Sequence, residues 1–364
     1  MKIGTLTFHR TTNYGGVLQA YALQKCISNL NYDINIINYN NIDIYSYYDY
    51  RVFYGRQSLK TRLGKIVRYG YNKAVYSLFE DFWNNYLSLS QECTSKEELK
   101  IVEEEYDVMI VGSDQIWNPN AIFKDFNAFL LEDFNGRKIS YAASAGNIHL
   151  WDNYLKIYWN DLHNFDYISV RESQMIDATC KLSGKEVSLV LDPTLLLNCK
   201  DWKLLENKVD VPKKYILIYY LGNNQKLEDD LYDFYKKTGL QIISIGKKLD
   251  KKFNSLRPVC GPREFLYLFH NASYIFTSSF HGTVFSIQYQ KQFVTYGNGG
   301  YNSRMETLLN TLELNNHLIV DEGYYKILNE KINWEKADKQ LTKERKKSLD
   351  FILNALNRDE RGNI

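Results

Sequence analysis

The 364-residue sequence lacks several features that would assign it to a common class of proteins. Its 45 lysines and arginines nearly balance 43 aspartates and glutamates, and the formal charge of +2 is too even for a dedicated nucleic-acid binder. No apolar run reaches the roughly 18 residues of a membrane-spanning helix, and neither a signal peptide nor an internal repeat is recognisable. We therefore expect a cytoplasmic protein without a nucleic-acid partner.

Cysteine is also sparse. The five cysteines, at positions 26, 93, 180, 199 and 260, are odd in number, scattered and without the close spacing of metal ligands. This pattern predicts free buried thiols in a reducing compartment, and no metal site.

The sequence does contain a regular alternation of strand-like and helix-like segments. An apolar run at 2–9, helical spacing over 16–30 and a second run at 33–38 predict a βαβ unit. Because the alternation continues, we expect parallel sheets with helices on both faces. The remaining predicted strands are 106–111, 137–141, 167–171, 187–191, 215–221, 240–245, 274–277 and 293–296, and the remaining helices are 151–162, 173–182, 225–238, 262–270, 283–290 and 303–311.

The alternation is interrupted near residues 205–212, and the chain is about twice the usual length of one domain. Both observations predict two α/β domains, the first at 1–208 and the second at 209–333. The final segment, 334–364, begins with a charged helix that is long enough to pack back on the first domain.

Two turns combine histidine with glycine, at residues 8–16 and 277–283. Each follows an apolar run and precedes helical spacing, which predicts a strand, a turn and the N-terminus of a helix. Backbone N–H groups and the positive end of the helix dipole favour an anion at such a place. Since the turns lie in different halves of the chain, they suggest a cleft built between two domains.

The stretch from Arg51 to Phe79 has seven basic residues and no acidic one, interleaved with aromatic and aliphatic residues. This composition fits a helix that lies on an anionic membrane surface. It fits an ordinary solvated helix covering the first domain equally well, and the sequence leaves both interpretations open.

The motifs together resemble the polysaccharide pyruvyl transferase family, over most of the chain. One departure lies at Ser279, Phe280 and His281, because members of the family carry an arginine shortly before the histidine. The matching segments are GTLTFH at 4–9, NYGGVLQAYAL at 13–23, VGSDQIWNP at 111–119, YAAS at 141–144, ISVRE at 168–172, LDPT at 191–194, SSFHG at 278–282 and NSRME at 302–306.

The resemblance implies a glycosyltransferase-B-like pair of Rossmann-like α/β domains. It also implies transfer of the pyruvyl group of phosphoenolpyruvate to two hydroxyls of a sugar, which gives a cyclic ketal and phosphate. The acceptor would be a cell-surface polysaccharide, its lipid-linked precursor or a glycan, with the first domain on the acceptor side and the second on the donor side. No metal or organic cofactor is implied.

Several residue types suit this chemistry. Phosphoenolpyruvate carries a phosphate and a carboxylate, so its site needs cations and N–H donors close together. Arg171 at a strand end, Arg304 at a helix start, and the turn with Ser279 and Gly282 can supply them. His281 is the acid/base candidate, because a proton must move near neutral pH; the alternative is a core or capping histidine.

Other candidates have an equally simple structural explanation. Asp114 either binds a sugar hydroxyl, acts as a base, or caps a turn. Trp117 either stacks on a sugar ring or belongs to the core. Asn13, Tyr14 and Gly15 form either a substrate contact or an ordinary turn. Asp192, which precedes a proline, is interpreted as a turn residue.

Two competing functions remain open at this stage. A nucleotide-sugar glycosyltransferase would use the same fold, with Glu264 as an acidic residue for the ribose. A non-catalytic polysaccharide assembly factor would keep the fold without chemistry, but it would have no need of His281 between the cations Arg171 and Arg304.

Overall fold

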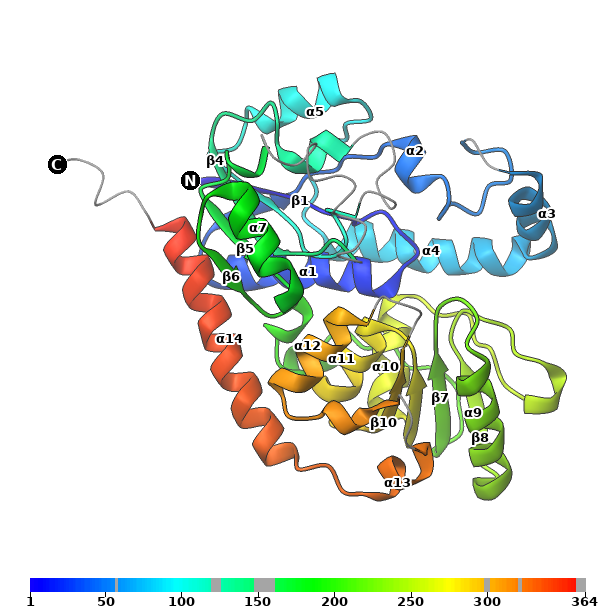
Figure 1. Ribbon diagram of the computed structural model, residues 1–364. Helices are drawn as coiled ribbons and strands as arrows, with labels where there is room; N and C mark the ends of the chain where they lie inside the picture. The colour runs from blue at the N-terminus through cyan, green and yellow to red at the C-terminus, as the bar shows by residue number, and fades with distance from the viewer. Residues whose placement is uncertain (56–57, 119–125, 147–160, 298–301, 320–322, 358–364) are drawn as a thin grey trace. The chain divides into compact units, whose positions relative to one another are not determined.

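The computed structural model describes residues 1–55, 58–118, 126–146, 161–297, 302–319 and 323–357, and it divides into two compact units (Figure 1). The first unit combines Met1–Leu196 with Lys343–Ile364, and the second comprises Leu197–Thr342. Both units are built on a parallel sheet, as the sequence predicts.

Six parallel strands form the sheet of the first unit, in the order β2-β1-β3-β4-β5-β6. All four residues of the central strand β3 are buried, because helices cover both faces of the sheet. The elements are β1 (Lys2–Leu6), α1 (Tyr14–Asn29), β2 (Asp33–Ile36), α2 (Ile42–Tyr45), α3 (Leu59–Val67), α4 (Tyr69–Tyr86), α5 (Lys96–Glu103), β3 (Val108–Val111), η1 (Phe126–Leu130), β4 (Arg137–Ala143), β5 (Tyr167–Val170), η3 (Ser173–Met175), α7 (Ile176–Ser183), β6 (Val187–Leu189) and η4 (Pro193–Leu195).

The two faces of this sheet are covered by different helices. Leu23 and Ile27 of α1 pack on one face together with Ile352 of α14 (Trp334–Leu356). Leu99 of α5 and Leu182 of α7 belong to the core on the other face. The end of the long C-terminal helix therefore packs on the first unit.

Hydrogen bonds to other parts of the first unit fix this end of α14. The hydroxyl of Ser348 accepts from the backbone N–H of Leu191 at 2.9 Å, and Arg345 donates to the carbonyl of Leu195 at 2.8 Å. Arg137 of β4 donates to the carbonyl of Leu356 at 2.8 Å, which satisfies a carbonyl at the helix C-terminus. The helix is thus tied to the segment that follows β6.

The second unit has five parallel strands in the order β11-β10-β9-β7-β8. Leu231 of α9 and Ile327 of α13 pack on one face, and Phe265 of α10 contacts Tyr219 of β7 and Phe285 of α11 on the other. The elements are α8 (Cys199–Lys203), β7 (Tyr215–Tyr219), α9 (Gln225–Thr238), β8 (Gln241–Ser244), η5 (Lys251–Phe253), α10 (Pro262–Asn271), β9 (Tyr274–Thr277), α11 (Phe280–Gln288), β10 (Gln292–Tyr296), α12 (Ser303–Thr311), η6 (Asn315–His317), β11 (Leu318–Ile319), α13 (Tyr324–Asn329) and the start of α14.

The division between the units falls before α8, whereas the sequence placed residues 197–208 in the first domain. The contacts of this segment explain the difference. Trp202 lies 5.2 Å from the ring of Phe285, and Gln288 donates to the carbonyl of Leu197 at 2.8 Å. Residues 334–342 likewise group with the second unit, so α14 belongs to the first unit only from Lys343 onward.

Most predicted elements are present, with differences at their ends. The helix predicted at 283–290 begins earlier, at Phe280, because the side chain of Ser279 caps it by accepting from the N–H of Gly282 at 3.4 Å. The basic stretch 51–79 contains two helices, α3 and α4, which meet at Arg68. Residues 151–160 of the predicted helix 151–162 lie outside the described residues. Across the described ranges, no helix has both the length and the apolar character needed to cross a membrane.

Candidate active site

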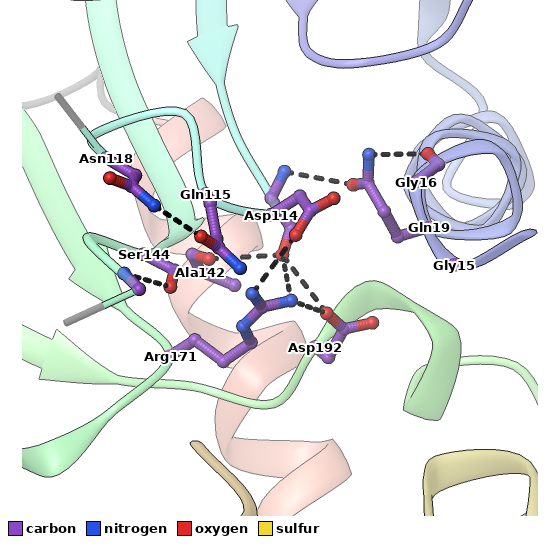
Figure 2. Close-up of polar contacts among 12 residues, drawn as sticks. Gly15, Gly16, Gln19, Asp114, Gln115, Asn118, Ala142, Ser144, Arg171 and Asp192 are labelled. Atoms are coloured by element: carbon purple, nitrogen blue, oxygen red, sulfur yellow. Dashed lines mark hydrogen bonds and ion pairs between the residues drawn. The ribbon is translucent and has the colours of Figure 1, made fainter. Parts of the chain in front are cut away.

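Three polar side chains meet where strands of the first sheet end. Asp114 follows β3, Arg171 follows β5 and Asp192 follows β6. These strands run parallel in one sheet, so their carboxyl ends lie at the same edge, where open α/β sheets bind ligands. Figure 2 shows the guanidinium of Arg171 pointing toward both carboxylates.

Arg171 forms an ion pair with each of the two aspartates. Its Nη1 lies 2.5 Å from Oδ2 of Asp192, and its Nη2 lies 3.4 Å from Oδ1 of Asp114. The arginine is 3% exposed and Asp192 is 1% exposed. Burial by itself would lower the pKa of Arg171, but the charges of Asp192 and Asp114 outweigh it and the pKa is raised. The cation is therefore held charged and balanced within the protein.

A second network ties Asp114 to the start of α1. Gln19 accepts from the N–H of Ser113 at 3.1 Å and donates to the carbonyl of Gly16 at 2.9 Å (Figure 2). A Cβ on Gly16 would lie only 3.5 Å from Oδ2 of Asp114, so that carboxylate oxygen faces the first turn of α1. A helix N-terminus stabilises negative charge, which suits an ionised aspartate here.

Gly112 is required by the turn that follows β3 and carries Asp114. Its φ is +114°, and a Cβ would lie 2.2 Å from the carbonyl oxygen of Tyr141. Only glycine permits this close approach of the turn to β4. The glycine in the predicted motif therefore shapes the turn that presents Asp114.

Asp192 belongs to this cluster as well, although from the sequence it is interpreted only as a turn residue. It does cap a turn, since Oδ1 accepts from the N–H of Thr194 at 3.0 Å, as the interpretation as a turn residue requires. Its Oδ2 also binds Arg171 and accepts from the hydroxyl of Ser113 at 3.2 Å. An aspartate directly after a strand, like Asp114, was the only signal in the sequence that could have suggested this second role.

The other candidates of the first unit have structural roles. Asn13 caps α1 by accepting from the N–H of Gly15 at 3.1 Å, and Tyr14 packs on Phe79 with ring centroids 5.0 Å apart. Trp117 is fully buried, and its indole N–H donates to the carbonyl of Phe129 at 3.3 Å. The sugar-stacking role is therefore not supported for Trp117, because its ring belongs to the core.

In the second unit, the structure brings His281 and Arg304 to one edge of the sheet. His281 lies in the first turn of α11, which follows β9, and Arg304 lies in the first turn of α12, which follows β10. Strands β9 and β10 are parallel neighbours, so both helix N-termini lie at the same edge. The ring of Phe280 touches both residues, 5.1 Å from the ring of His281 and 5.7 Å from the guanidinium carbon of Arg304.

Gly282 and Ser279 shape this edge. A Cβ on Gly282 would lie 2.1 Å from Oγ1 of Thr277, which itself donates to the carbonyl of Tyr219 at 2.6 Å. The glycine therefore lets α11 begin directly against the end of β9. With Ser279 capping the helix, the first turns of α11 and α12 bring N–H donors, a histidine and an arginine to one place, an arrangement suited to an anion.

A family model described as polysaccharide pyruvyl transferase matches residues 13–300, which is more than half of the chain. The chain belongs to the polysaccharide pyruvyl transferase family. The match includes the turns with Asp114, Arg171, Asp192 and His281 and ends shortly before Arg304. A search of curated proteins found no match.

Solved structures resemble this family member in fold. UDP-N-acetylglucosamine 2-epimerase from Rickettsia bellii is 13% identical, with 97% of this chain and 96% of that chain covered and a TM-score of 0.54. The UDP-GlcNAc 2-epimerase from Neisseria meningitidis bound to UDP-GlcNAc is 11% identical, with 98% and 99% covered and a TM-score of 0.52. At such identity the likeness concerns the fold alone, and it confirms the glycosyltransferase-B-like pair of α/β domains.

Proposed function

We propose that this transferase moves the pyruvyl group of phosphoenolpyruvate onto two hydroxyls of a sugar in a cell-surface polysaccharide or its lipid-linked precursor. Membership of the family supports the reaction type. The structural observation that carries the proposal is the pairing of His281 and Arg304 in the first turns of α11 and α12, at one edge of the second sheet. Two helix N-termini with an arginine suit a donor that bears a phosphate and a carboxylate.

The reaction needs only proton transfers, one addition to the enol double bond and one substitution of phosphate, both at the same carbon. The two sugar oxygens bond to the central carbon of the donor, and the bond from that carbon to the phosphate oxygen breaks. Each hydroxyl loses one proton. One of these protons converts the enol methylene to a methyl group, and the other leaves on the phosphate. Ketal and hydrogen phosphate are therefore the only products, and no cofactor is consumed.

In this proposal His281 protonates the enol carbon and then accepts a proton from a hydroxyl, since imidazole changes protonation near neutral pH. Arg304 and the backbone donors beside Ser279 and Gly282 bind the anionic groups. Asp114 of the first unit is assigned to the acceptor, as a group that binds a sugar hydroxyl. Arg171 holds Asp114 in position as a buried ion-pair partner. This positioning role is an alternative to the direct contact with phosphoenolpyruvate that the sequence suggested for Arg171.

Thermal unfolding with different ligands tests the proposal. Because a ligand of the folded state raises the unfolding temperature, phosphoenolpyruvate should stabilise the protein and UDP-N-acetylglucosamine should not. Arg304→Ala should reduce the shift strongly at the same ligand concentration, whereas Lys236→Ala, an exposed lysine near the end of α9, should keep it. A shift with the nucleotide sugar alone would favour a glycosyltransferase, and no shift with either ligand would favour a non-catalytic assembly factor.

Two contacts of Glu264 bear on the glycosyltransferase alternative. Glu264, the residue suggested for the ribose, accepts from the N–H of Gly261 at 2.9 Å and from the amide of Asn207 at 2.6 Å. Its two oxygens thus hold the segment before β7 against the start of α10. A ribose hydroxyl would have to reach a carboxylate that is 8% exposed and already accepts these two bonds.

We also propose that α3 contacts an anionic membrane. Leu59, Leu63, Ile66 and Val67 are 77%, 63%, 55% and 85% exposed and recur at the spacing of one helix face. An apolar stripe with basic neighbours is typical of a helix that lies in a membrane surface.

Vesicle binding at low salt tests the membrane contact. Replacing Lys60, Arg62 and Arg68 together by Glu should weaken binding to vesicles with phosphatidylglycerol. Lys65 is kept, because it is buried and donates to the carbonyl of Ser46 at 3.0 Å. The matched control replaces three exposed lysines of α14 by Glu, and equal binding by both triple variants would refute the contact. The control residues are Lys339, Lys343 and Lys346.

A further inference from the structure

A polar pocket of about 260 Å³ lies wholly within the first unit. It is separate from Asp114 and Arg171, and nothing in the reaction proposed above uses it. Its lining combines tyrosine rings with charged and amide side chains. The lining residues are Arg10, Asn40, Tyr45, Asp49, Tyr50, Arg51, Tyr54, Tyr76 and Glu80.

The pocket lies at the ligand-binding edge of the first sheet. Arg10 belongs to the segment after β1 and Asn40 to the segment after β2, and these two strands are parallel neighbours. Tyr76 and Glu80 come from α4, and Asp49 from the segment between α2 and α3. The segments that follow β1 and β2 and the helices between β2 and β3 thus supply the lining.

The walls of the pocket are held in place by partly buried contacts. Asp49 is 5% exposed, and its carboxylate accepts from Arg51 through the backbone N–H at 2.7 Å, Nε at 3.0 Å and Nη2 at 2.6 Å. The guanidinium of Arg51 lies 3.8 Å from the centre of the Tyr54 ring. On the other side, Arg10 donates to Oδ1 of Asn38 at 2.8 Å. Such a wall is organised before a ligand arrives, which lowers the entropic cost of binding.

The charge of the lining points to a neutral ligand. Two arginines face two carboxylates, Asp49 and Glu80, so the pocket has no net attraction for an anion such as phosphoenolpyruvate. Hydroxyl groups, in contrast, can donate to a carboxylate and accept from a guanidinium or an amide. Partly exposed tyrosines also offer apolar ring faces with a polar edge, which suits the C–H faces and hydroxyls of a sugar.

The size of the pocket limits the ligand further. Drug-sized ligands occupy pockets of about 300–1,000 Å³. A pocket of about 260 Å³ therefore suits a single sugar ring and is too small for a nucleotide sugar.

We infer that this pocket binds one sugar ring of the acceptor glycan, with Tyr54, Tyr76 and Glu80 as contacts. That the sugar belongs to the acceptor rests on the proposed function, but sugar binding itself can be measured without it. The segment between β2 and β3, which also contains the proposed membrane helix α3, thereby has a role in acceptor recognition.

The experiment is saturation-transfer NMR with the full-length protein and five methyl glycosides, those of glucose, galactose, mannose, N-acetylglucosamine and rhamnose. Each is measured with and without phosphoenolpyruvate. At least one should bind the parent, and Tyr54→Ala and Glu80→Gln should each weaken that sugar about tenfold or more. Tyr47→Ala is the matched control, because Tyr47 lies in the same segment, is 70% exposed and does not line the pocket.

The outcomes separate this inference from the proposed reaction. Equal binding by the parent and both pocket variants, or no binding of any of the five glycosides to the parent, would overturn the sugar pocket. Sugar binding that depends on Tyr54 and Glu80, in a protein that phosphoenolpyruvate does not stabilise, would uphold the pocket and refute pyruvyl transfer. Unchanged stabilisation by phosphoenolpyruvate in Glu80→Gln would show that the donor site is intact.

Discussion

The two sheets present different groups at their carboxyl edges. In the first unit arginines contact carboxylates: Arg171 contacts Asp114 and Asp192, and Arg51 contacts Asp49. In the second unit, Arg304 and His281 stand in the first turns of neighbouring helices and share the ring of Phe280. The same topology can therefore place at its ligand-binding edge either arginines that contact carboxylates or helix N-termini that carry a histidine and an arginine.

The largest effect should come from His281. If it transfers protons, His281→Asn should lower saturated turnover by roughly 10²–10⁴, the usual contribution of general acid–base catalysis, while donor affinity changes little. Turnover measured at saturating phosphoenolpyruvate, together with the donor dissociation constant of the same variant, checks this. If the variant turned over normally once saturated and only lost affinity, His281 would be a ligand for the phosphate.

Arg171 should matter for stability as much as for activity. Removing it leaves buried aspartates without their cation, which typically costs about 3–5 kcal/mol. We expect Arg171→Met to lose that much free energy of unfolding in urea, and Arg171→Met/Asp192→Asn to recover part of it. Arg304→Met should cost about 1 kcal/mol or less, in line with a partly exposed residue. Similar losses in the two single variants would erase the contrast between the sheets.

Arg304 should control donor affinity instead. Losing a charge-assisted contact costs about 1.5–3 kcal/mol, so Arg304→Ala should weaken phosphoenolpyruvate roughly ten- to a hundredfold. Arg304→Lys should recover only part of this, because a point charge does not replace a planar fork. Isothermal titration of both variants measures the effect, and donor affinity equal to that of the parent would exclude this arginine from the site.

The smallest effect expected in the parent protein concerns protons in the first unit, because two groups there titrate in opposite directions. Burial lowers the pKa of His9 to about 4, so the unfolded chain binds more protons between pH 6.5 and 4 and acid destabilises the fold. Burial raises the pKa of Glu103 to about 7, aided by the charge of Asp133, so the folded chain holds a proton between pH 7 and 4.5 and acid stabilises the fold. The two effects oppose each other between pH 6.5 and 4.5.

Glu103→Gln should therefore expose the effect of His9. The free energy of unfolding of this variant, measured in urea, should fall by roughly 3 kcal/mol between pH 6.5 and 4, relative to its own value at pH 7. The free energy of unfolding of the parent should change less between pH 6.5 and 4.5. The double variant His9→Gln/Glu103→Gln provides the reference without either group. A flat profile in Glu103→Gln would show that His9 is not the group that resists protonation.

Local signals explain why much of the fold could be predicted. The helix at 225–238 matches α9, because Asn224 caps it by accepting from the N–H of Leu227 at 3.0 Å and Gly239 ends it with φ of 63°. The helix with His281 was predicted to start too late, because the polar and glycine residues at 277–283 were all interpreted as one turn, although α11 begins at Phe280. Capping residues were thus informative where a glycine ends the helix, and less so where a glycine lies in its first turn.

The candidate site was harder to predict, because its decisive contacts join residues far apart in the chain. Asp192 binds an arginine 21 positions earlier, and Ser113 binds Asp192 from 79 positions away. Trp117 has the residue type of a sugar platform, but only its buried surroundings reveal a core residue. Residue type and order were sufficient to predict the turns. They were not sufficient to predict which turn carries the charge that balances the charge of another turn.

The last turns of α14 affect the order in which the protein is made. The second unit is complete once residue 342 has been synthesised, whereas the first unit still lacks Ile352, Ala355 and Leu356 from one of its cores. The N–H of Leu191 and the carbonyl of Leu195 also wait for Ser348 and Arg345. Domains usually fold in the order of their synthesis. Here the ribosome delivers most of the N-terminal unit first and completes it only after the second unit, so the segment that carries Asp192 stays uncapped until α14 has been made.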